Sequence, residues 1–196
     1  ANVYMIDFDK RINDFITSQK GIYRRYCDDI IVVIPMTHNE INCGRNEEIS
    51  KFIYDTRDGI PNLKLNEDKT EHFFYNNGKI EKIKGQSNLI NYLGFTFDGR
   101  IVHIRDKSLF KFCCRAYRKI KRIKENTDEK SFNAGKKAIY HSYTHLGASK
   151  YSKDHGNFLT YAYKADEIFS QSKVLESGIR NQVKRHWYKI DSKLKE

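Results

Sequence analysis

Several features that would place this chain in a particular protein class are missing from its sequence. No apolar run approaches the roughly 20 residues needed to cross a membrane, and no signal-peptide pattern opens the chain. The sequence has no internal repeat and no low-complexity tract. Its four cysteines form no CxxC pair and no disulfide-like spacing; they are Cys27, Cys43, Cys113 and Cys114. We therefore expect a globular protein without a membrane partner in a reducing, cytoplasmic compartment.

Charge is distributed unevenly along the 196 residues, a length that allows one large domain or two small ones. Residues 1–105 hold 15 Lys/Arg and 15 Asp/Glu, whereas residues 106–196 hold 21 and 10, so the whole net charge of +11 lies in the second half. This asymmetry indicates a near-neutral half joined to a basic half that binds a polyanion. A basic surface that serves only solubility is the alternative. The first residue is Ala1 rather than Met, and we expect the chain to be part of a longer protein.

Two adjacent aspartates, Asp28 and Asp29, stand between strand-like runs in the segment 21–35. Five consecutive aliphatic residues follow, from Ile30 to Ile34, and this pattern predicts a strand buried on both faces. We expect a hairpin whose turn presents both carboxylates to one spot. Paired carboxylates suit Mg²⁺, which accepts one or two of them and completes its shell with water and phosphate oxygens. An ordinary Asp-rich turn is the alternative.

The tetrapeptide Tyr26-Cys27-Asp28-Asp29 resembles the Tyr-X-Asp-Asp signature of reverse transcriptases. Its lead-in, residues 23–26, is similar to bacterial members, the group II intron and retron-type enzymes. The resemblance implies an α+β fold, with part of a right-hand polymerase palm in residues 1–105 and an all-α basic thumb in residues 106–196. It also implies an RNA-directed DNA polymerase that uses Mg²⁺, or alternatively Mn²⁺, with dNTPs, an RNA template and a DNA primer. Asp28 and Asp29 would bind the metal, and Tyr26 would pack under the primer terminus.

A second motif of the same palm follows at Lys69-Thr70. Leu63 and Leu65 alternate with polar residues, which predicts a strand, and a polar loop then leads to Lys69. The segment resembles the reverse-transcriptase motif whose Lys-Thr lies close to the nucleotide triphosphate. Lys69 would then stabilise or protonate the departing pyrophosphate. Without the order of motifs, Lys69 would be an ordinary surface lysine.

A third motif lies in residues 91–97, before an Asp98-Gly99 pair that predicts a hairpin into residues 100–105. This segment resembles the primer grip, which holds the primer 3′ end over the metals. Glycine would let a nucleic-acid backbone approach closely, and the aromatic residues would contact sugars or bases. The alternative is that these aromatics simply pack the sheet, and we expect both to be partly true. The residues concerned are Tyr92, Leu93, Gly94 and Phe95.

The first long helix of the basic half is predicted at residues 106–124. Its expected apolar face consists of Leu109, Phe110, Cys113, Tyr117, Ile120 and Ile123. Four cations at i, i+4, i+7 and i+11 line another face, and no residue from Lys107 to Lys124 is acidic. Like charges stacked in this way repel unless a polyanion lies alongside, so we predict that this helix binds a phosphate backbone, as a polymerase thumb would. The cations are Lys111, Arg115, Arg118 and Arg122; a solvated helix face is the alternative.

Other segments have simpler predictions. We expect helices at 1–18, from Asn46 to about 58, and at 131–146, 157–171 and 175–194, a loop at 36–44, and a hairpin at 71–83. Asp7 and Asp9 could be read as a metal motif, but a solvated helix face is the preferred interpretation. His141 and His145 have zinc-compatible spacing without an evident third ligand, and Cys113 and Cys114 are expected to serve packing.

Two expectations concern the whole protein. A reverse transcriptase needs a further aspartate and the fingers from upstream of residue 1, in the same or another chain. The competing class is a non-catalytic nucleic-acid-binding module or an inactive polymerase remnant. The segments 143–147 and 156–163 look like the helical C-terminal region of bacterial defence-associated reverse transcriptases, which suggests antiviral defence by analogy.

Overall fold

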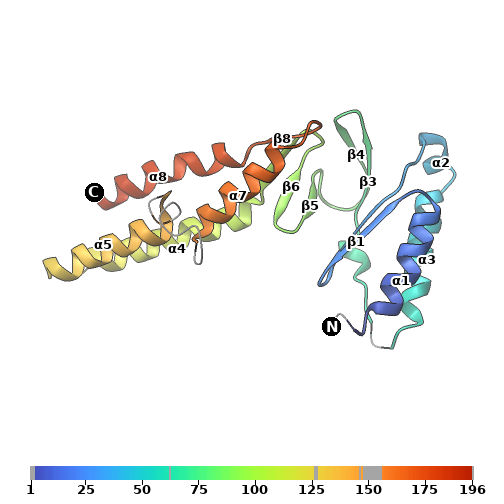
Figure 1. The fold of residues 1–196 in the computed structure, drawn as a ribbon, viewed down its shortest axis with the longest axis horizontal. Coiled ribbons are helices and arrows are strands. Elements are labelled where there is room, and N and C mark those ends of the chain that lie inside the picture. The colour runs from blue at the N-terminus through green and yellow to red at the C-terminus, as the bar shows by residue number, and fades with distance from the viewer. Residues whose placement is uncertain (1–2, 62, 126–127, 146, 148–155, 196) are drawn as a thin grey trace. The chain divides into compact units, whose positions relative to one another are not determined.

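The computed structural model describes residues 3–61, 63–125, 128–145, 147 and 156–195. The fold is α+β, as predicted, and the chain divides into two compact units (Figure 1). The first unit comprises residues 1–74 and 81–87, and the second comprises residues 75–80 and 88–196. Among the described residues, no helix has the length and apolar character required to cross a bilayer.

The first unit is built on helix α1 (Ile6–Ser18), which has the predicted amphipathic pattern. Its buried residues Phe8, Ile12 and Ile16 form a core with Tyr23 of strand β1 (Ile22–Tyr26). Strand β1 pairs antiparallel with β2 (Asp29–Val33), which confirms the predicted hairpin. Helix α3 (Arg45–Asp58) closes the core, and Phe15 and Phe52 stack with ring centroids 3.8 Å apart.

Burial of β2 on both faces was predicted and is wrong. Val32 packs against the core, but Val33 is 54% exposed and its cross-strand partner Ile22 is 53% exposed. The sheet has only two strands. Helix α1 packs on one face of this hairpin, so alternate side chains on the other face stay open to solvent.

Two predictions for the first unit differ from the structure. The predicted loop at 36–44 contains helix α2 (His38–Asn42), because Thr37 and Glu40 form a capping box. Helix α3 was predicted from Asn46 but starts one residue earlier, at Arg45, with Gly44 (φ 83°) as its N-cap.

Alternation of Leu63 and Leu65 predicted a strand that does not form. Both side chains pack against the core, but residues 63–66 have no strand partner and lead into a 3₁₀ turn, η1 (Glu67–Lys69). The alternation of Leu63 and Leu65 therefore correctly indicated that these side chains are partly buried, but it wrongly predicted that the segment pairs with another strand.

A hairpin at residues 71–83 was predicted and is confirmed. Strands β3 (His72–Asn76) and β4 (Lys79–Lys84) form a two-stranded sheet. Asn77 and Gly78 both have positive φ, 48° and 81°, the geometry of a tight two-residue hairpin turn.

The second unit contains a sheet of order β5-β6-β7-β8. Strands β5 (Ile90–Tyr92), β6 (Phe95–Phe97) and β7 (Ile101–Ile104) run antiparallel, and β8 (Glu176–Ser177) pairs parallel with β7. The helices are α4 (Asp106–Lys124), α5 (Glu129–Tyr143), α7 (Phe158–Ser170) and α8 (Ile179–Lys195).

These helices match the predicted segments with two differences. The predicted helix at 175–194 begins at Ile179, because Glu176 and Ser177 pair with β7 instead. Helix α5 starts two residues before the predicted start at Ser131 and ends at Tyr143, because Thr144 is its C-cap in an extended conformation. Leu146, the predicted end, lies outside the described residues.

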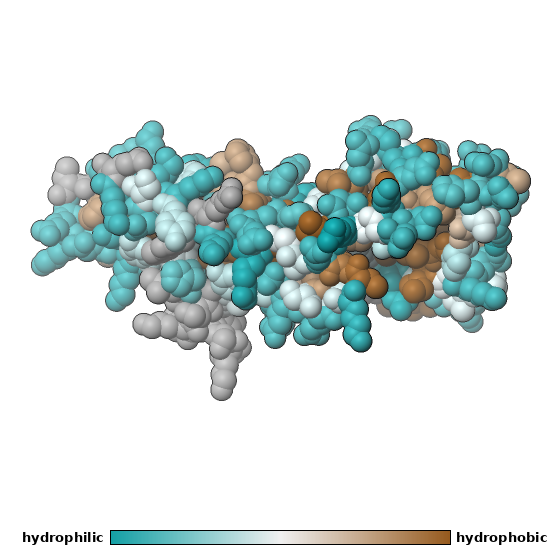
Figure 2. Space-filling view, turned by 90° about the horizontal axis from the view of Figure 1, so that it is seen from above, coloured by the Kyte–Doolittle hydropathy of each residue, from teal (hydrophilic) through white to brown (hydrophobic). Residues whose placement is uncertain are grey.

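The buried face of helix α4 matches the predicted face in part. Ile120 and Ile123 are buried, and Leu109 and Tyr117 pack against the core, as predicted. Phe110 is 68% exposed, however, and Phe112 and Ala116 are buried in its place. Phe112 packs with α7 and α8, and Ala116 and Ile123 pack with α5 and α8. On the face shown in Figure 2, hydrophilic side chains cover most of the visible surface of the helical unit.

Candidate functional site

The two adjacent aspartates lie at the tip of the β1–β2 hairpin. Tyr26 pairs with Asp29, which leaves Cys27 and Asp28 as the two residues of the turn. Cys27 has a φ of 52°, so the reversal is concentrated there. Tyr26, Asp28 and Asp29 are all exposed, and Tyr26 and Asp29 share the hairpin face that is not covered by α1. The structure thus brings together the three residues of the first predicted motif.

Neither carboxylate is used to stabilise the fold. In the described part of the chain, Asp28 and Asp29 have no ion pair and no side-chain hydrogen bond. Asp98 shows what a structural turn aspartate does: its Oδ1 accepts from the backbone N–H of Arg100 at 2.8 Å and of Ile101 at 2.7 Å. Asp28 makes no such bond, so its oxygens and those of Asp29 remain available to a cation.

The hairpin is anchored by a partly buried ion pair. Arg25 Nε and Nη2 donate to Asp9 Oδ1 and Oδ2 at 2.7 and 2.6 Å, and Tyr23 Oη donates to Asp9 Oδ1 at 2.6 Å. Arg25 Nη1 also donates to the carbonyl oxygen of Cys27 at 2.8 Å. One guanidinium therefore connects helix α1 to the residue that reverses the chain before Asp28.

This network decides between the interpretations of Asp9. The hydrogen-bonded guanidinium of Arg25 lowers the pKa of the Asp9 carboxyl, and burial raises the pKa of Tyr23. Asp9 is thus a partner of Arg25. The metal interpretation of Asp9 fails because both of its oxygens are occupied, and it is not part of a solvated face either.

Lys69 ends the 3₁₀ turn η1 and is exposed. Its neighbour Thr70 accepts a hydrogen bond from Tyr54 Oη at 2.9 Å and donates to the carbonyl oxygen of Asn66 at 3.2 Å. Asn66 also caps the turn through the N–H of Asp68. Thr70 is therefore fixed to helix α3, whereas the ammonium of Lys69 has no partner among the described residues.

The third motif lies at the turn between β5 and β6. Leu93 and Gly94 have φ values of 48° and 85° and join β5 to β6, which places Tyr92 opposite Phe95. A Cβ at Gly94 would meet nothing within 4 Å, so the backbone there is open to approach. Phe95 packs against Tyr161 and Phe169, with ring centroids 5.7 and 5.1 Å away, which favours the packing interpretation for its side chain.

The cations of α4 lie on one exposed face. All four are exposed, and none forms an ion pair with a described acidic residue; they are Lys111, Arg115, Arg118 and Arg122. Arg118 Nε donates to the carbonyl oxygen of Cys114 at 3.3 Å. The stripe places one cation about every 5.5 Å along the helix axis, on the opposite side from the buried Ala116 and Ile120.

No protein-family model matches this chain. No curated protein matches it either. The function is therefore argued from the residues and their geometry.

The fit of the acidic pair to a metal ion is partial. The residues described include no group of three or more His, Cys, Asp or Glu side chains that could hold a metal. Asp28 and Asp29 offer hard oxygen donors, which suit Mg²⁺ or Mn²⁺ when phosphate and water complete the shell. His141 and His145 belong to no such group, and both make interactions within the protein.

Sequence reasoning missed two features of the helical unit. Helix α8 carries six Lys/Arg and one Asp, a bias as plain in the sequence as that of α4. Cys113 Sγ lies 3.1 Å from Nε2 of His186, and no spacing rule links residues so far apart in sequence. Burial raises the pKa of Cys113 and lowers that of His186, so this is a neutral packing contact and the expected packing role of Cys113 is retained.

Proposed function

We propose that this chain is the palm-and-thumb part of a reverse-transcriptase-type polymerase, an RNA-directed DNA polymerase that extends a primer 3′ end. The observation that carries the proposal is the pair Asp28–Asp29, exposed at a hairpin tip and bound to no other described side chain. Lys69 and the open turn at Gly94 support it by their order along the chain. The exposed stripe on α4 supports binding of a polyanion.

The reaction is a nucleotidyl transfer. The primer 3′-oxygen forms a bond to the α-phosphorus of a dNTP, the bond from that phosphorus to the bridging oxygen breaks, and pyrophosphate leaves. The 3′-hydroxyl loses its proton to solvent. Bound Mg²⁺ or Mn²⁺ would stabilise charge on the attacking and leaving oxygens.

The residues of the chain have separate roles in this proposal. Asp28 and Asp29 hold the cation, and the exposed ammonium of Lys69 neutralises or protonates the pyrophosphate. Tyr26, which shares the open hairpin face with Asp29, contacts the primer terminus. In the second unit, Tyr92 and the backbone at Gly94 contact nucleic acid. A further carboxylate and the fingers would come from another segment of the protein.

The test is primer extension by the natural gene product on an RNA template with a DNA primer and dNTPs in Mg²⁺. Asp28→Asn and Asp29→Asn should each reduce extension by about 10³-fold, since the charge stabilisation lost is several kcal/mol. Lys64→Ala, an exposed lysine of the same unit, is the control and should leave the rate unchanged. Equal extension by the Asp28→Asn protein and the wild type would overturn the proposal.

A second candidate function, nucleic-acid binding without catalysis, is favoured by one observation. The four cations of the α4 stripe are exposed and form no ion pair with a described acidic residue, whether or not the acidic pair binds metal. If the protein only binds nucleic acid, the gene product would bind it with a steep salt dependence, yet it would not extend a primer.

A further inference from the structure

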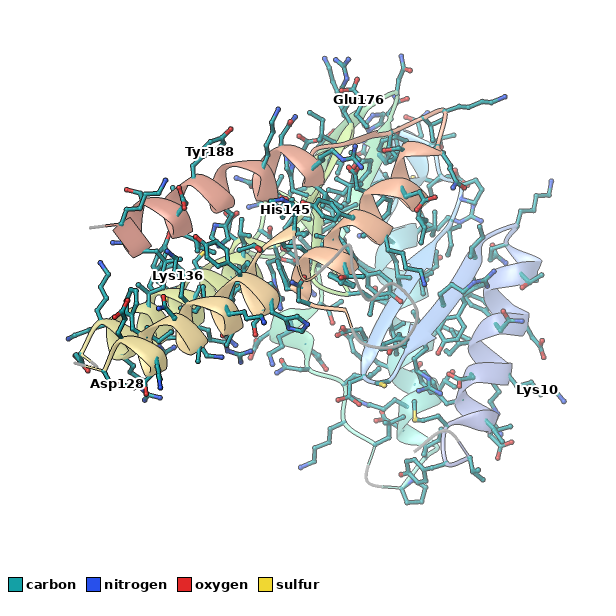
Figure 3. The ribbon with its side chains drawn as sticks, turned by 60° about the vertical axis from the view of Figure 1, so that its left-hand side comes forward. Lys10, Asp128, Lys136, His145, Glu176 and Tyr188 are labelled. Atoms are coloured by element: carbon teal, nitrogen blue, oxygen red, sulfur yellow. The ribbon has the colours of Figure 1, made fainter. Side chains whose placement is uncertain are left out.

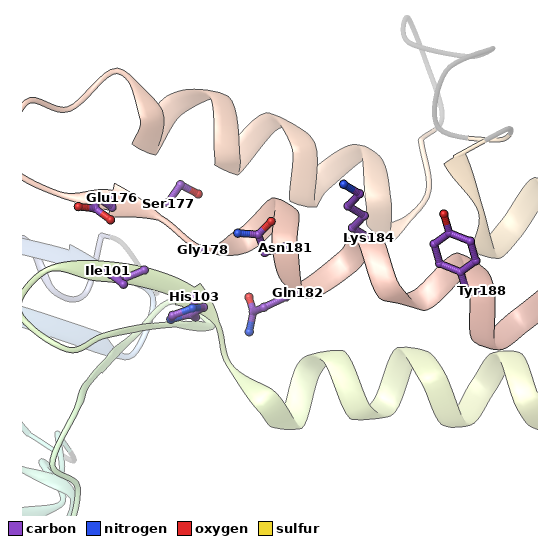
Figure 4. Close-up of a pocket in the computed structure, with 9 residues that line it drawn as sticks. All are labelled: Ile101, His103, Glu176, Ser177, Gly178, Asn181, Gln182, Lys184 and Tyr188. Carbon is purple, nitrogen blue, oxygen red and sulfur yellow. The ribbon is translucent and has the colours of Figure 1, made fainter.

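A groove in the second unit lies between strands β7 and β8 and the first three turns of α8 (Figure 4). It has a volume of about 760 Å³ and opens to solvent. Such a volume falls in the range of small-molecule sites. None of the sequence motifs includes it.

The floor of the groove is rigid. Gly178 N–H donates to the carbonyl oxygen of Val102 at 2.9 Å, and a Cβ at Gly178 would stand 2.3 Å from Nε2 of His103. The Gln182 amide binds strand β7 twice, since its Oε1 accepts from Ile104 N–H at 2.8 Å and its Nε2 donates to Ile104 O at 3.0 Å. The groove is therefore formed before any ligand arrives, which lowers the entropic cost of binding.

Three lining side chains of α8 are not used by the fold. Asn181, Lys184 and Tyr188 fall at i, i+3 and i+7, all exposed, and none has a hydrogen bond or ion pair to a residue that the structure describes. Tyr188 is 70% exposed and projects from the outer side of the helix (Figure 3). Together they span about 10 Å of the helix.

The charge around the groove favours an anion. Glu176 is paired with Arg100 at 2.7 Å, so its charge is offset, while Lys184 remains unpaired among the described residues. His103 lies on the floor of the groove beside Gly178. A cation, an amide and an aromatic ring in line are the groups that bind a phosphate, a base edge and a base face.

We propose that this groove binds an unpaired nucleotide of a single-stranded nucleic acid. Tyr188 stacks on the base, Asn181 hydrogen-bonds its edge, and Lys184 contacts a phosphate. The proposal rests on the proposed nucleic-acid binding and adds to it a second surface, on α8, that selects single strands. A duplex offers no unstacked base and gains nothing from Tyr188.

Fluorescence anisotropy of the gene product tests this assignment, with a labelled 12-nucleotide single strand and the matching duplex as probes, about the size that one binding module covers. Tyr188→Ala should weaken single-strand binding by about 5- to 100-fold and leave duplex binding unchanged. Tyr188→Phe should bind like the wild type, because the ring is retained. Ile168→Ala, which changes an exposed residue of α7 outside the groove, is the control.

The outcomes separate this proposal from the wider one. If the wild type binds both probes and Tyr188→Ala leaves single-strand binding unchanged, the groove assignment alone is wrong. If Tyr188→Ala weakens both probes equally, stacking on an unpaired base is wrong. If the wild type binds neither probe, nucleic-acid binding fails altogether, and the groove assignment fails with it.

Discussion

Arg25 and Asp9 form a doubly hydrogen-bonded ion pair that joins strand β1 to helix α1. The Arg25 side chain is 9% exposed, and its guanidinium also donates to the carbonyl oxygen of Cys27 at the turn before Asp28. The position of the acidic pair therefore depends on a carboxylate about 20 residues earlier in the chain. We expect the first unit to be sensitive to the loss of that carboxylate.

Asp9→Asn should lower the free energy of unfolding by about 2 kcal/mol, since it leaves a buried guanidinium without its counter-charge. Urea unfolding monitored by circular dichroism measures this loss. Asp14→Asn changes an exposed aspartate of the same helix and should stay within about 0.5 kcal/mol of wild type. Equal stability of the Asp9→Asn and Asp14→Asn proteins would show that the ion pair does not anchor the hairpin.

Acid should weaken the same contact. Because Arg25 lowers the folded-state pKa of Asp9, its contribution is fully present above the usual aspartate pKa of about 4 and is lost as the pH falls through the lower folded value. Asp9→Asn should therefore lose less stability between pH 5 and pH 2 than the wild type. Parallel stability curves for the two proteins over that range would contradict this prediction.

His186 should give the second unit a different pH dependence. Burial, with Lys189 nearby, lowers the folded-state pKa of His186, and the facing groups on α4 are Cys113 and Tyr117. Its neutral form stabilises the fold above its unfolded pKa of about 6.5, and that stability is lost as the pH falls below it. His186→Phe should flatten the melting temperature between pH 7.5 and pH 5, while His141→Phe, at an exposed site on α5, should not. An unchanged slope in His186→Phe would contradict the assignment.

The close packing of α4 on α5 depends on Gly135. A Cβ there would stand 2.7 Å from Cγ1 of Ile123. Although alanine favours a helix by about 1 kcal/mol over glycine, Gly135→Ala should destabilise the protein by about 1–3 kcal/mol through overpacking. Ile123→Val with Gly135→Ala should recover part of the loss, and a stabilising Gly135→Ala would show that the helices do not meet so closely.

Replacing the four stripe cations of α4 by alanine should reduce the salt slope of duplex binding by up to about 3.6, at roughly 0.9 per phosphate contact. The variant combines Lys111→Ala, Arg115→Ala, Arg118→Ala and Arg122→Ala. Filter binding over a range of KCl concentrations measures the slope. The matched control removes four exposed lysines of the first unit, at Lys10, Lys51, Lys64 and Lys82, and should change the slope little. Equal slopes for the two variants would mean that binding reflects net charge alone.

Local sequence patterns predicted most elements of the fold. Helix α1, the hairpin at Asp28, the turn at Asn77-Gly78 and the exposed stripe on α4 follow from periodicity and turn chemistry over short windows. The predictions were wrong where contacts with residues distant in the sequence determine the local structure. Residues Glu176 and Ser177 become a strand only because β7 lies beside them.

The candidate site could be predicted only in part, because some of its features follow from local sequence and others from contacts between distant residues. The exposure of Asp28 and Asp29 follows from their place in a turn, but the anchoring of that turn by Asp9 depends on how α1 packs on β1. Phe95 was predicted from its motif and is held by Tyr161 and Phe169, which no local pattern indicates.

Paramagnetic line broadening by trace Mn²⁺, read from the amide spectrum of the protein, tests most directly whether Asp28 and Asp29 bind a divalent cation. We predict that broadening is strongest at residues 27–30, is reversed by excess Mg²⁺, and disappears in the double variant Asp28→Asn/Asp29→Asn, while Asp14→Asn behaves like the wild type. Broadening that is centred elsewhere, or that persists in the double variant, would contradict the account.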